Sequence, residues 1–192
     1  MKKDLEKAKN ILSEEFSFNA DFLYSTVEEL KLKKSVKILD IGTGFGVMSI
    51  ILALQGYNVI TGEPEGHNWA NWRESAKKLS VEDLITFKFF RAEDLPFEDK
   101  SFDAVFCYTS FHHIDDKQPA LREFVRVTKD KGLVIIFEFN PTGIEIVRKR
   151  RPSHPDAVNP EDFSRNLPLS LEIKKGKYIN AYIYKKTNDS KK

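Results

Sequence analysis

The chain has 192 residues, enough for one domain with a sizeable core, and 41% hydrophobic with 31% charged residues is an ordinary composition for a globular protein. The net charge of +2 argues neither for nor against nucleic acid as a partner, and the longest apolar run has about half the length of a membrane span. The single cysteine, Cys107, excludes an intramolecular disulfide framework and indicates a reducing, cytoplasmic compartment. The first ten residues, MKKDLEKAKN, lack the apolar region of a signal peptide.

Two helical patterns begin the chain. Leu5, Ala8, Leu12 and Phe16 recur at spacings of three or four residues, which predicts one face of a helix. A second pattern of the same kind uses Leu23, Val27 and Leu30. We therefore expect residues 1–34 to form a helical cap at the N-terminus.

Strand and helix patterns then alternate four times over about 100 residues. Such alternation predicts right-handed crossovers and an α/β fold, in which helices cover both faces of a doubly wound, mostly parallel sheet. The expected strands cover residues 36–39, 58–61, 84–90, 102–108 and 133–139. The expected helices carry the apolar residues Val47, Ile50, Ile51 and Leu54, then Trp69, Trp72, Ala76 and Leu79, and finally residues 119–127.

The last part of the chain follows a different pattern. LSLEIKK and YINAYIYKK, joined through Gly176, predict an antiparallel hairpin that completes the sheet. Five prolines between residues 141 and 168 predict an irregular loop over the edge of the sheet. No domain boundary is evident, so we expect residues 1–187 to form one domain and residues 188–192 a disordered tail.

A turn with three glycines follows the first expected strand. Gly42, Gly44 and Gly46 leave the backbone without side chains where a doubly wound sheet binds its ligand. Glu63 ends the second strand beside the same crevice, where a carboxylate can accept both hydroxyls of a ribose. The turn and the acid together predict a nucleoside ligand.

Two further residues favour one class of nucleoside. A dinucleotide site has the pattern G-x-G-x-x-G, but the last position here is Val47. Asp40 lies two residues before Gly42, where it would repel a pyrophosphate and suit an ammonium group. S-adenosylmethionine combines an ammonium group with a ribose and an adenine, so it fits better than a nicotinamide dinucleotide.

Three motifs carry a resemblance to a known family. ILDIGTGFG resembles the first motif of class I S-adenosylmethionine-dependent methyltransferases. RAEDLPFEDKSFDAVFCYTSFHHIDD and LREFVRVTKDKGLVIIFEF resemble later motifs of the branch that includes ubiquinone- and menaquinone-biosynthesis methyltransferases. The resemblance spans roughly residues 36–139 and implies a three-layer, Rossmann-like methyltransferase fold, with seven strands of which the last is antiparallel.

The resemblance also implies roles for individual residues. The acid and the glycine turn would hold the methionine end of the cofactor, and Glu63 its ribose. Ala92 and Glu93 would lie against the adenine, although Arg91 stands where relatives often have Asp or Asn. Cys107 and Tyr108 would border the sulfonium. The implied cofactor-binding residues are Asp40, Gly42, Thr43, Gly44, Gly46, Glu63, Ala92, Glu93, Cys107 and Tyr108.

The sequence indicates the catalytic and substrate-binding residues less clearly than the cofactor-binding residues. His112 and His113 are candidate general bases, because His titrates near neutrality, but a structural hydrogen bond explains the pair equally well. No metal site is expected, because adjacent His side chains should diverge and no third ligand stands at metal spacing. His67 and His154 receive no role. Phe16, Phe18 and Tyr24 are candidate substrate contacts, with core packing as the alternative. The basic run RKRR, residues 148–151 with Arg148 as the candidate contact, could face an acidic substrate or RNA phosphates, with a solvated surface as the alternative. Nucleic acid is not the expected partner, because no aromatic residue is interleaved to stack on bases.

These features predict an enzyme that transfers a methyl group from S-adenosylmethionine to a small-molecule acceptor by in-line displacement. A non-catalytic partner or regulatory subunit that binds S-adenosylmethionine is one alternative, and a nicotinamide-dependent oxidoreductase is another. Loops choose the acceptor on such a scaffold, so the sequence leaves the acceptor open, and the oligomeric state as well.

Overall fold

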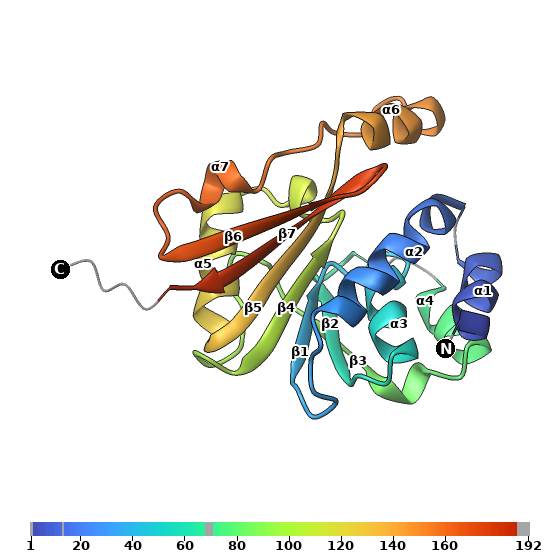
Figure 1. The fold of residues 1–192 in the computed structure, drawn as a ribbon, viewed down its shortest axis with the longest axis horizontal. Helices are drawn as coiled ribbons and strands as arrows, with labels where there is room; N and C mark the ends of the chain where they lie inside the picture. The colour runs from blue at the N-terminus through green and yellow to red at the C-terminus, as the bar shows by residue number, and fades with distance from the viewer. Residues whose placement is uncertain (1, 13, 68–70, 188–192) are drawn as a thin grey trace.

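The computed structural model describes residues 2–12, 14–67 and 71–187 (Figure 1). Two expectations concern residues outside these ranges: the disordered tail at 188–192, and Trp69 on the face of its helix. The helices are α1 (Lys2–Ile11), α2 (Glu14–Glu29), α3 (Val47–Leu54), α4 (Trp72–Lys78), α5 (Lys117–Val127), α6 (Pro141–Arg150) and α7 (Glu161–Ser164), with the short 3₁₀ helices η1 (Glu82–Leu84) and η2 (Phe111–His113). The strands are β1 (Ile38–Ile41), β2 (Val59–Glu63), β3 (Ile85–Phe89), β4 (Phe102–Tyr108), β5 (Thr128–Phe139), β6 (Leu169–Lys175) and β7 (Ile179–Lys186).

The seven strands form one sheet in the order β3-β2-β1-β4-β5-β7-β6. Strands β1 to β5 pair in parallel, and β7 lies antiparallel between β5 and β6. This arrangement confirms the expected doubly wound sheet with an antiparallel last strand. Because the strand order reverses at β1, the carboxyl ends of β1 and β4 flank the crevice where such sheets bind ligands.

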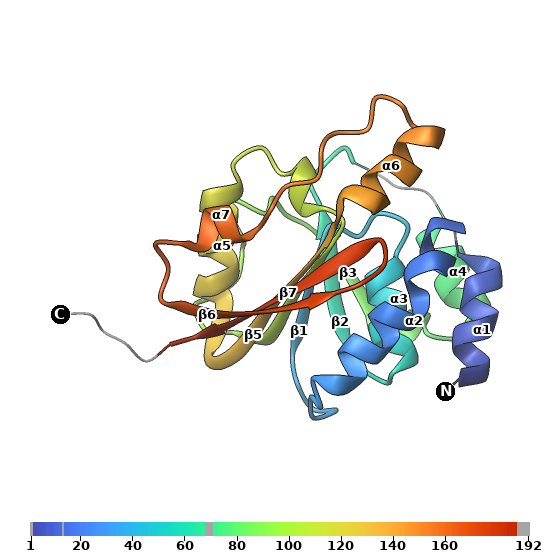
Figure 2. The ribbon, with the colours of Figure 1, turned by 45° about the horizontal axis from the view of Figure 1, so that its top comes forward.

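Helices cover both faces of the sheet, as Figures 1 and 2 show, with α5 on one face and α2 and α3 on the other. Successive residues of a strand point to opposite faces, and the core divides accordingly. Ile38 and Phe106 pack in the cluster that includes α1 to α4. Leu39 and Val105 pack in the second cluster, against α5.

Within the described ranges, no helix is both long and apolar enough to cross a membrane.

The first helical pattern spans two helices rather than one. The helix α1 ends at Ile11, and Phe16 lies on α2, which begins at Glu14. Leu5, Ala8, Leu12 and Phe16 are nevertheless all buried in one cluster. Both helices pack their apolar residues into this one cluster, so the apolar spacing continues from α1 into α2. The pattern of apolar residues therefore did not reveal where α1 ends.

The stretch 141–168 is more regular than its prolines suggested. Pro141 begins α6 instead of only closing β5, because proline is well tolerated in the first turn of a helix. The side chain of Asn140 caps this helix, since its Oδ1 accepts from the Gly143 amide at 3.0 Å. The expected irregular loop is therefore wrong for residues 141–150 and for α7.

Candidate functional site

A cavity of about 470 Å³ lies at the carboxyl ends of the parallel strands. The last residues of β1, β2, β4 and β5 all line it, which is where an α/β sheet places its ligand. The lining residues are Phe16, Ile41, Gly42, Thr43, Gly44, Phe45, Val47, Met48, Gly62, Glu63, Pro64, His67, Phe90, Arg91, Ala92, Glu93, Tyr108, Thr109, Ser110, His113, Ile114, Asp115, Phe139, Val147, Arg151 and His154.

The three glycines of the turn have different functions in the structure. All have positive φ, but a Cβ on Gly42 would lie 2.3 Å from Ser110 Oγ and one on Gly46 2.8 Å from Trp72 Cβ. Gly46 is also absent from the cavity wall, so it serves close packing rather than direct ligand contact. A Cβ on Gly44 meets nothing within 4 Å. Gly44 is therefore the glycine that keeps cavity space open.

Glu63 ends β2 beside the glycine turn. Its Oε1 accepts the backbone N–H of Gly44, with a donor–acceptor distance of 2.6 Å. The residue is 9% exposed, and burial raises the pKa of its carboxyl group. A carboxylate is thus held on the cavity wall against Gly44, the glycine of this turn at which a Cβ would meet open space.

Asp40 does not line the cavity, contrary to the expectation that it holds the methionine end of a cofactor. It is fully buried, and its Oδ2 accepts from Ser49 on α3 and from Thr61 Oγ1, the latter at 2.9 Å. Burial raises its pKa to about 7. The Thr61 hydroxyl also lies 2.9 Å from that of Thr43, so Asp40 supports the glycine turn from beneath.

Strand alternation separates the two residues expected beside the sulfonium. Tyr108 lines the cavity, whereas Cys107 is fully buried in the cluster against α5. Burial also raises the pKa of the Cys107 thiol well above its usual range. Ala92 and Glu93 line the cavity as expected, and Arg91 lies beside them with its Nη2 3.7 Å from Glu93 Oε1.

Three of the expected substrate contacts do not line the cavity. Phe18 is 44% exposed and packs against Tyr178, and Tyr24 is buried in the core. Arg148 lies on α6 and pairs through Nη2 with Asp156 Oδ1 at 2.8 Å. Of the expected aromatic contacts, only Phe16 is on the cavity wall.

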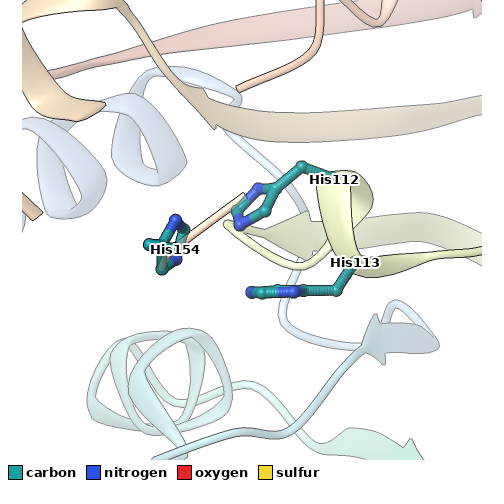
Figure 3. Close-up of side chains that lie close together, drawn as sticks. All are labelled: His112, His113 and His154. Carbon is teal, nitrogen blue, oxygen red and sulfur yellow. The ribbon is translucent and has the colours of Figure 1, made fainter. Parts of the chain in front are cut away.

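The histidines converge, contrary to the expectation that adjacent His side chains diverge. The ring centroids of His112 and His113 lie 4.1 Å apart, and the His154 ring lies 5.0 and 5.3 Å from them (Figure 3). His113 and His154 line the cavity, and His112 is buried behind them. Partial burial and the neighbouring His112 lower the pKa of His113 to about 4, so this imidazole is neutral at pH 7.

Residues 39–136 match the family described as methyltransferase domain. The chain belongs to this methyltransferase family. A demethylmenaquinone methyltransferase of Clavibacter sepedonicus is 32% identical over 125 residues, which cover 65% of this chain and 49% of that protein. The 27-O-demethylrifamycin SV methyltransferase of Amycolatopsis mediterranei is 30% identical, over 63% of this chain and 46% of that protein. The chain thus spans about half the length of these relatives.

Solved structures agree on the methyltransferase fold. The PH0226 protein of Pyrococcus horikoshii OT3 aligns over 93% of this chain and 94% of its own, with a TM-score of 0.76 and 22% identity. An S-adenosylmethionine-dependent methyltransferase of Aquifex aeolicus aligns over 94% and 97%, with a TM-score of 0.66 and 18% identity. The cyclase SpnF aligns over 62% and 44%, with a TM-score of 0.55 and 26% identity.

The family match ends before the residues that close the cavity on its β5 side. Phe139, Val147 and His154 line the cavity but received no role from the sequence, and Arg151, the last residue of the basic run RKRR, lines it as well. Ile144, Val147 and Arg151 recur at helical spacing, a signal that the prolines of this stretch obscured. The approach of His154 to His112 depends on the tertiary fold, and no local pattern indicates it.

Proposed function

We propose that this protein transfers a methyl group from S-adenosylmethionine to a small-molecule acceptor. The observation that carries the proposal is the pairing of Gly44 with Glu63 on the wall of a 470 Å³ cavity in a methyltransferase-family chain. S-adenosylmethionine, when bound, supplies a methyl group on a sulfonium that is already a good leaving group.

The residues present fit this cofactor. Glu63 offers two carboxylate oxygens to the hydroxyls of a ribose, and Gly44 leaves open space beside it. Phe90 and Ala92, in the segment that follows β3, add an apolar wall for an adenine. Asp40 acts from beneath the turn, and its Oδ1 has no hydrogen-bond partner among the described residues. The proposed cofactor end of the cavity therefore lies over β1, β2 and β3.

The acceptor would then occupy the other end, over β4, β5 and α6. Phe16, Tyr108, Phe139 and Val147 give this end apolar surface, and His113, Arg151 and His154 give it polar groups. A cavity of this size leaves little room beyond a nucleoside cofactor, which favours a small acceptor. The names of the menaquinone- and rifamycin-related relatives support the same class of acceptor.

The chain's contribution to the reaction is mainly positioning. The cavity walls hold the acceptor in line with the methyl group and exclude water, an effect that can be worth roughly 7–11 kcal/mol. His113 is a weak general base, because its pKa of about 4 leaves little driving force for accepting a proton at pH 7. An acceptor with a neutral or already ionised nucleophile suits such a site best.

Calorimetric titration tests the proposal. We expect S-adenosylmethionine and S-adenosylhomocysteine to bind and NADH not to bind. In Glu63→Ala the affinity should fall by about 1.5–3 kcal/mol, the scale of hydrogen bonds to a charged group, while Glu65→Ala, an exposed neighbour, should bind as the wild type does. Binding of NADH alone, or equal affinities in both variants, would refute the assignment.

A second candidate is a chain that binds S-adenosylmethionine without transferring its methyl group. The similarity to SpnF, named a cyclase, favours keeping this alternative, since the fold is compatible with a reaction other than methyl transfer. Formation of S-adenosylhomocysteine across a broad panel of small acceptors would decide for transfer. Cofactor binding with no methyl transfer across the panel would favour this second candidate.

We further propose that residues 1–187 act as one domain, since α1, α2 and the sheet share one core cluster.

A further inference from the structure

Three histidines from two separate segments gather beside the cavity. His112 and His113 come from η2, and His154 comes from the loop after α6 (Figure 3). Each offers one ring nitrogen such that the three nitrogens lie within 4.8 Å of one another. The cluster forms part of the wall at the end of the cavity assigned to the acceptor, and methyl transfer by itself does not explain it.

His112 presents a nitrogen lone pair to the cluster. Its Nδ1 lies 2.8 Å from Oε1 of Glu138, whose carboxylate also accepts the backbone N–H groups of His112 at 3.2 Å and Phe139 at 2.8 Å. A carboxylate that accepts these bonds makes His112 Nδ1 the donor, so the lone pair lies on Nε2. This Nε2 is buried and has no hydrogen-bond partner among the described residues. An unsatisfied acceptor in such a position is costly unless a ligand completes it.

His154 is oriented in the same way. Its Nδ1 lies 3.0 Å from the carbonyl oxygen of Pro155, which can only accept, so the lone pair of this ring is also on Nε2. Arg148 fixes the loop, because its Nε donates to the His154 carbonyl at 3.1 Å and its Nη2 pairs with Asp156. The loop that carries the third histidine is therefore tied to α6.

We propose that His112, His113 and His154 bind a divalent transition-metal ion of the zinc type. Neutral imidazole is the commonest protein ligand for such ions, and a carboxylate behind a ligating His, as Glu138 lies behind His112, is the usual means of fixing its tautomer. Three histidines leave at least one coordination position open, as catalytic sites do. Because His113 and His154 line the cavity, that position faces its interior.

The separation of the ligand atoms is compatible with this proposal. Metal–nitrogen bonds of about 2.0–2.1 Å in a tetrahedral site place the nitrogens about 3.3 Å apart. The three ring nitrogens, which now lie within 4.8 Å of one another, would thus move slightly closer together when the ion binds. His113 and His154 sit on a short helix and a loop, where small rotations of the rings suffice.

Arg151, also on the cavity wall, would favour an anionic group of an acceptor at the open position. That last assignment rests on the proposed function, whereas metal binding does not.

Titration with Co²⁺ after dialysis against a chelator tests the site, because Co²⁺ in a site with three nitrogen ligands gives visible d–d absorption. We expect saturation at one Co²⁺ per chain and complete displacement by Zn²⁺. His154→Ala should abolish the absorption, and Glu138→Gln should weaken Co²⁺ binding about 10- to 100-fold. His67→Ala, which removes another cavity histidine outside the cluster, is the matched control and should leave the absorption unchanged.

Circular dichroism distinguishes loss of ligand from loss of fold. His154 is itself half-buried but its neighbours in the loop are exposed, so truncation of its side chain should preserve the fold. No Co²⁺ absorption in the folded wild type, or equal absorption in the folded His154→Ala variant, would overturn the proposal. So would a loss in His67→Ala as large as that in His154→Ala. Metal binding without S-adenosylmethionine binding would leave the metal site standing and refute only the proposed function.

Discussion

Gly44 and Gly56 share one backbone property but differ in their surroundings. Both have positive φ, and a Cβ on either meets nothing within 4 Å. Gly44 lines the cavity, whereas Gly56 lies after the end of α3 and does not line it. Alanine at either position should therefore cost a similar stability, about 1–2 kcal/mol for a left-handed conformation.

Ligand affinity should separate these two glycines. We expect Gly44→Ala to weaken S-adenosylhomocysteine binding at least about tenfold, since its Cβ projects into the space proposed for the ligand. Gly56→Ala should bind as the wild type does. Calorimetric titration of both variants, with their unfolding free energies measured in parallel, checks this. Equal affinities in the two variants would show that the open space at Gly44 is not ligand space.

The buried Asp40 should make stability depend on pH. Its pKa is near 3.8 in the unfolded chain and about 7 in the fold, because burial disfavours the charged form. The folded state therefore holds the proton more tightly, and this stabilisation is present below pH 4 and lost as pH rises towards 7. Asp40→Asn removes the titration. The unfolding free energy of the wild type relative to this variant should fall by up to about 4 kcal/mol between pH 4 and pH 8, as urea unfolding would measure. A difference that stays constant with pH would contradict a raised pKa.

Single residues also show what the sequence could and could not predict. Glu63 and Tyr108, the last residues of β2 and β4, are on the cavity wall, and so is Gly44 in the turn after β1. Asp40 and Cys107 lie behind the wall because each is the second-last residue of its strand, and in these two strands the last residues, Ile41 and Tyr108, line the cavity. The expected strand at residues 36–39 placed Asp40 just beyond its end, whereas β1 covers Ile38–Ile41 and places Asp40 inside the strand.

At the scale of elements, the contacts between α6 and the loop that follows it can be tested directly. Arg148 connects them through the His154 carbonyl and Asp156. We expect Arg148→Ala to speed amide hydrogen exchange over residues 152–158, because the loop loses these contacts. Lys149→Ala, an exposed neighbour on the same helix, should not change the exchange. Unchanged exchange in Arg148→Ala would show that other contacts hold the loop.

The sequence predicted the elements unevenly for a physical reason. The βα alternation requires crossover connections between parallel strands, so the parallel pairing of the core followed from periodicity. The stretch 141–168 did not, since proline is compatible with both a loop and the first turn of a helix. Asn140, which caps α6, was the local signal that favoured the helix.

At the scale of the whole molecule, the cavity joins residues far apart in the chain. Phe16 on α2 and His154 after α6 line the same space, together with the ends of four strands. A ligand in this cavity would contact both the N-terminal helices and the segment after β5. Its binding should therefore stabilise the fold as one unit, and not only the glycine turn.

Thermal unfolding measures this coupling. With S-adenosylhomocysteine at 100 times its Kd, linkage raises the unfolding free energy by about 2.7 kcal/mol. For a chain of this length, that increase should raise Tm by about 5–10 °C, and near-ultraviolet and far-ultraviolet circular dichroism should report the same shift. NADH at the same concentration is the control and should leave Tm unchanged. Suppose instead that the ligand shifts only the near-ultraviolet transition. The cavity would then belong to a locally stabilised part of the chain, and the contacts of α2 and α6 with it would not be coupled to the sheet.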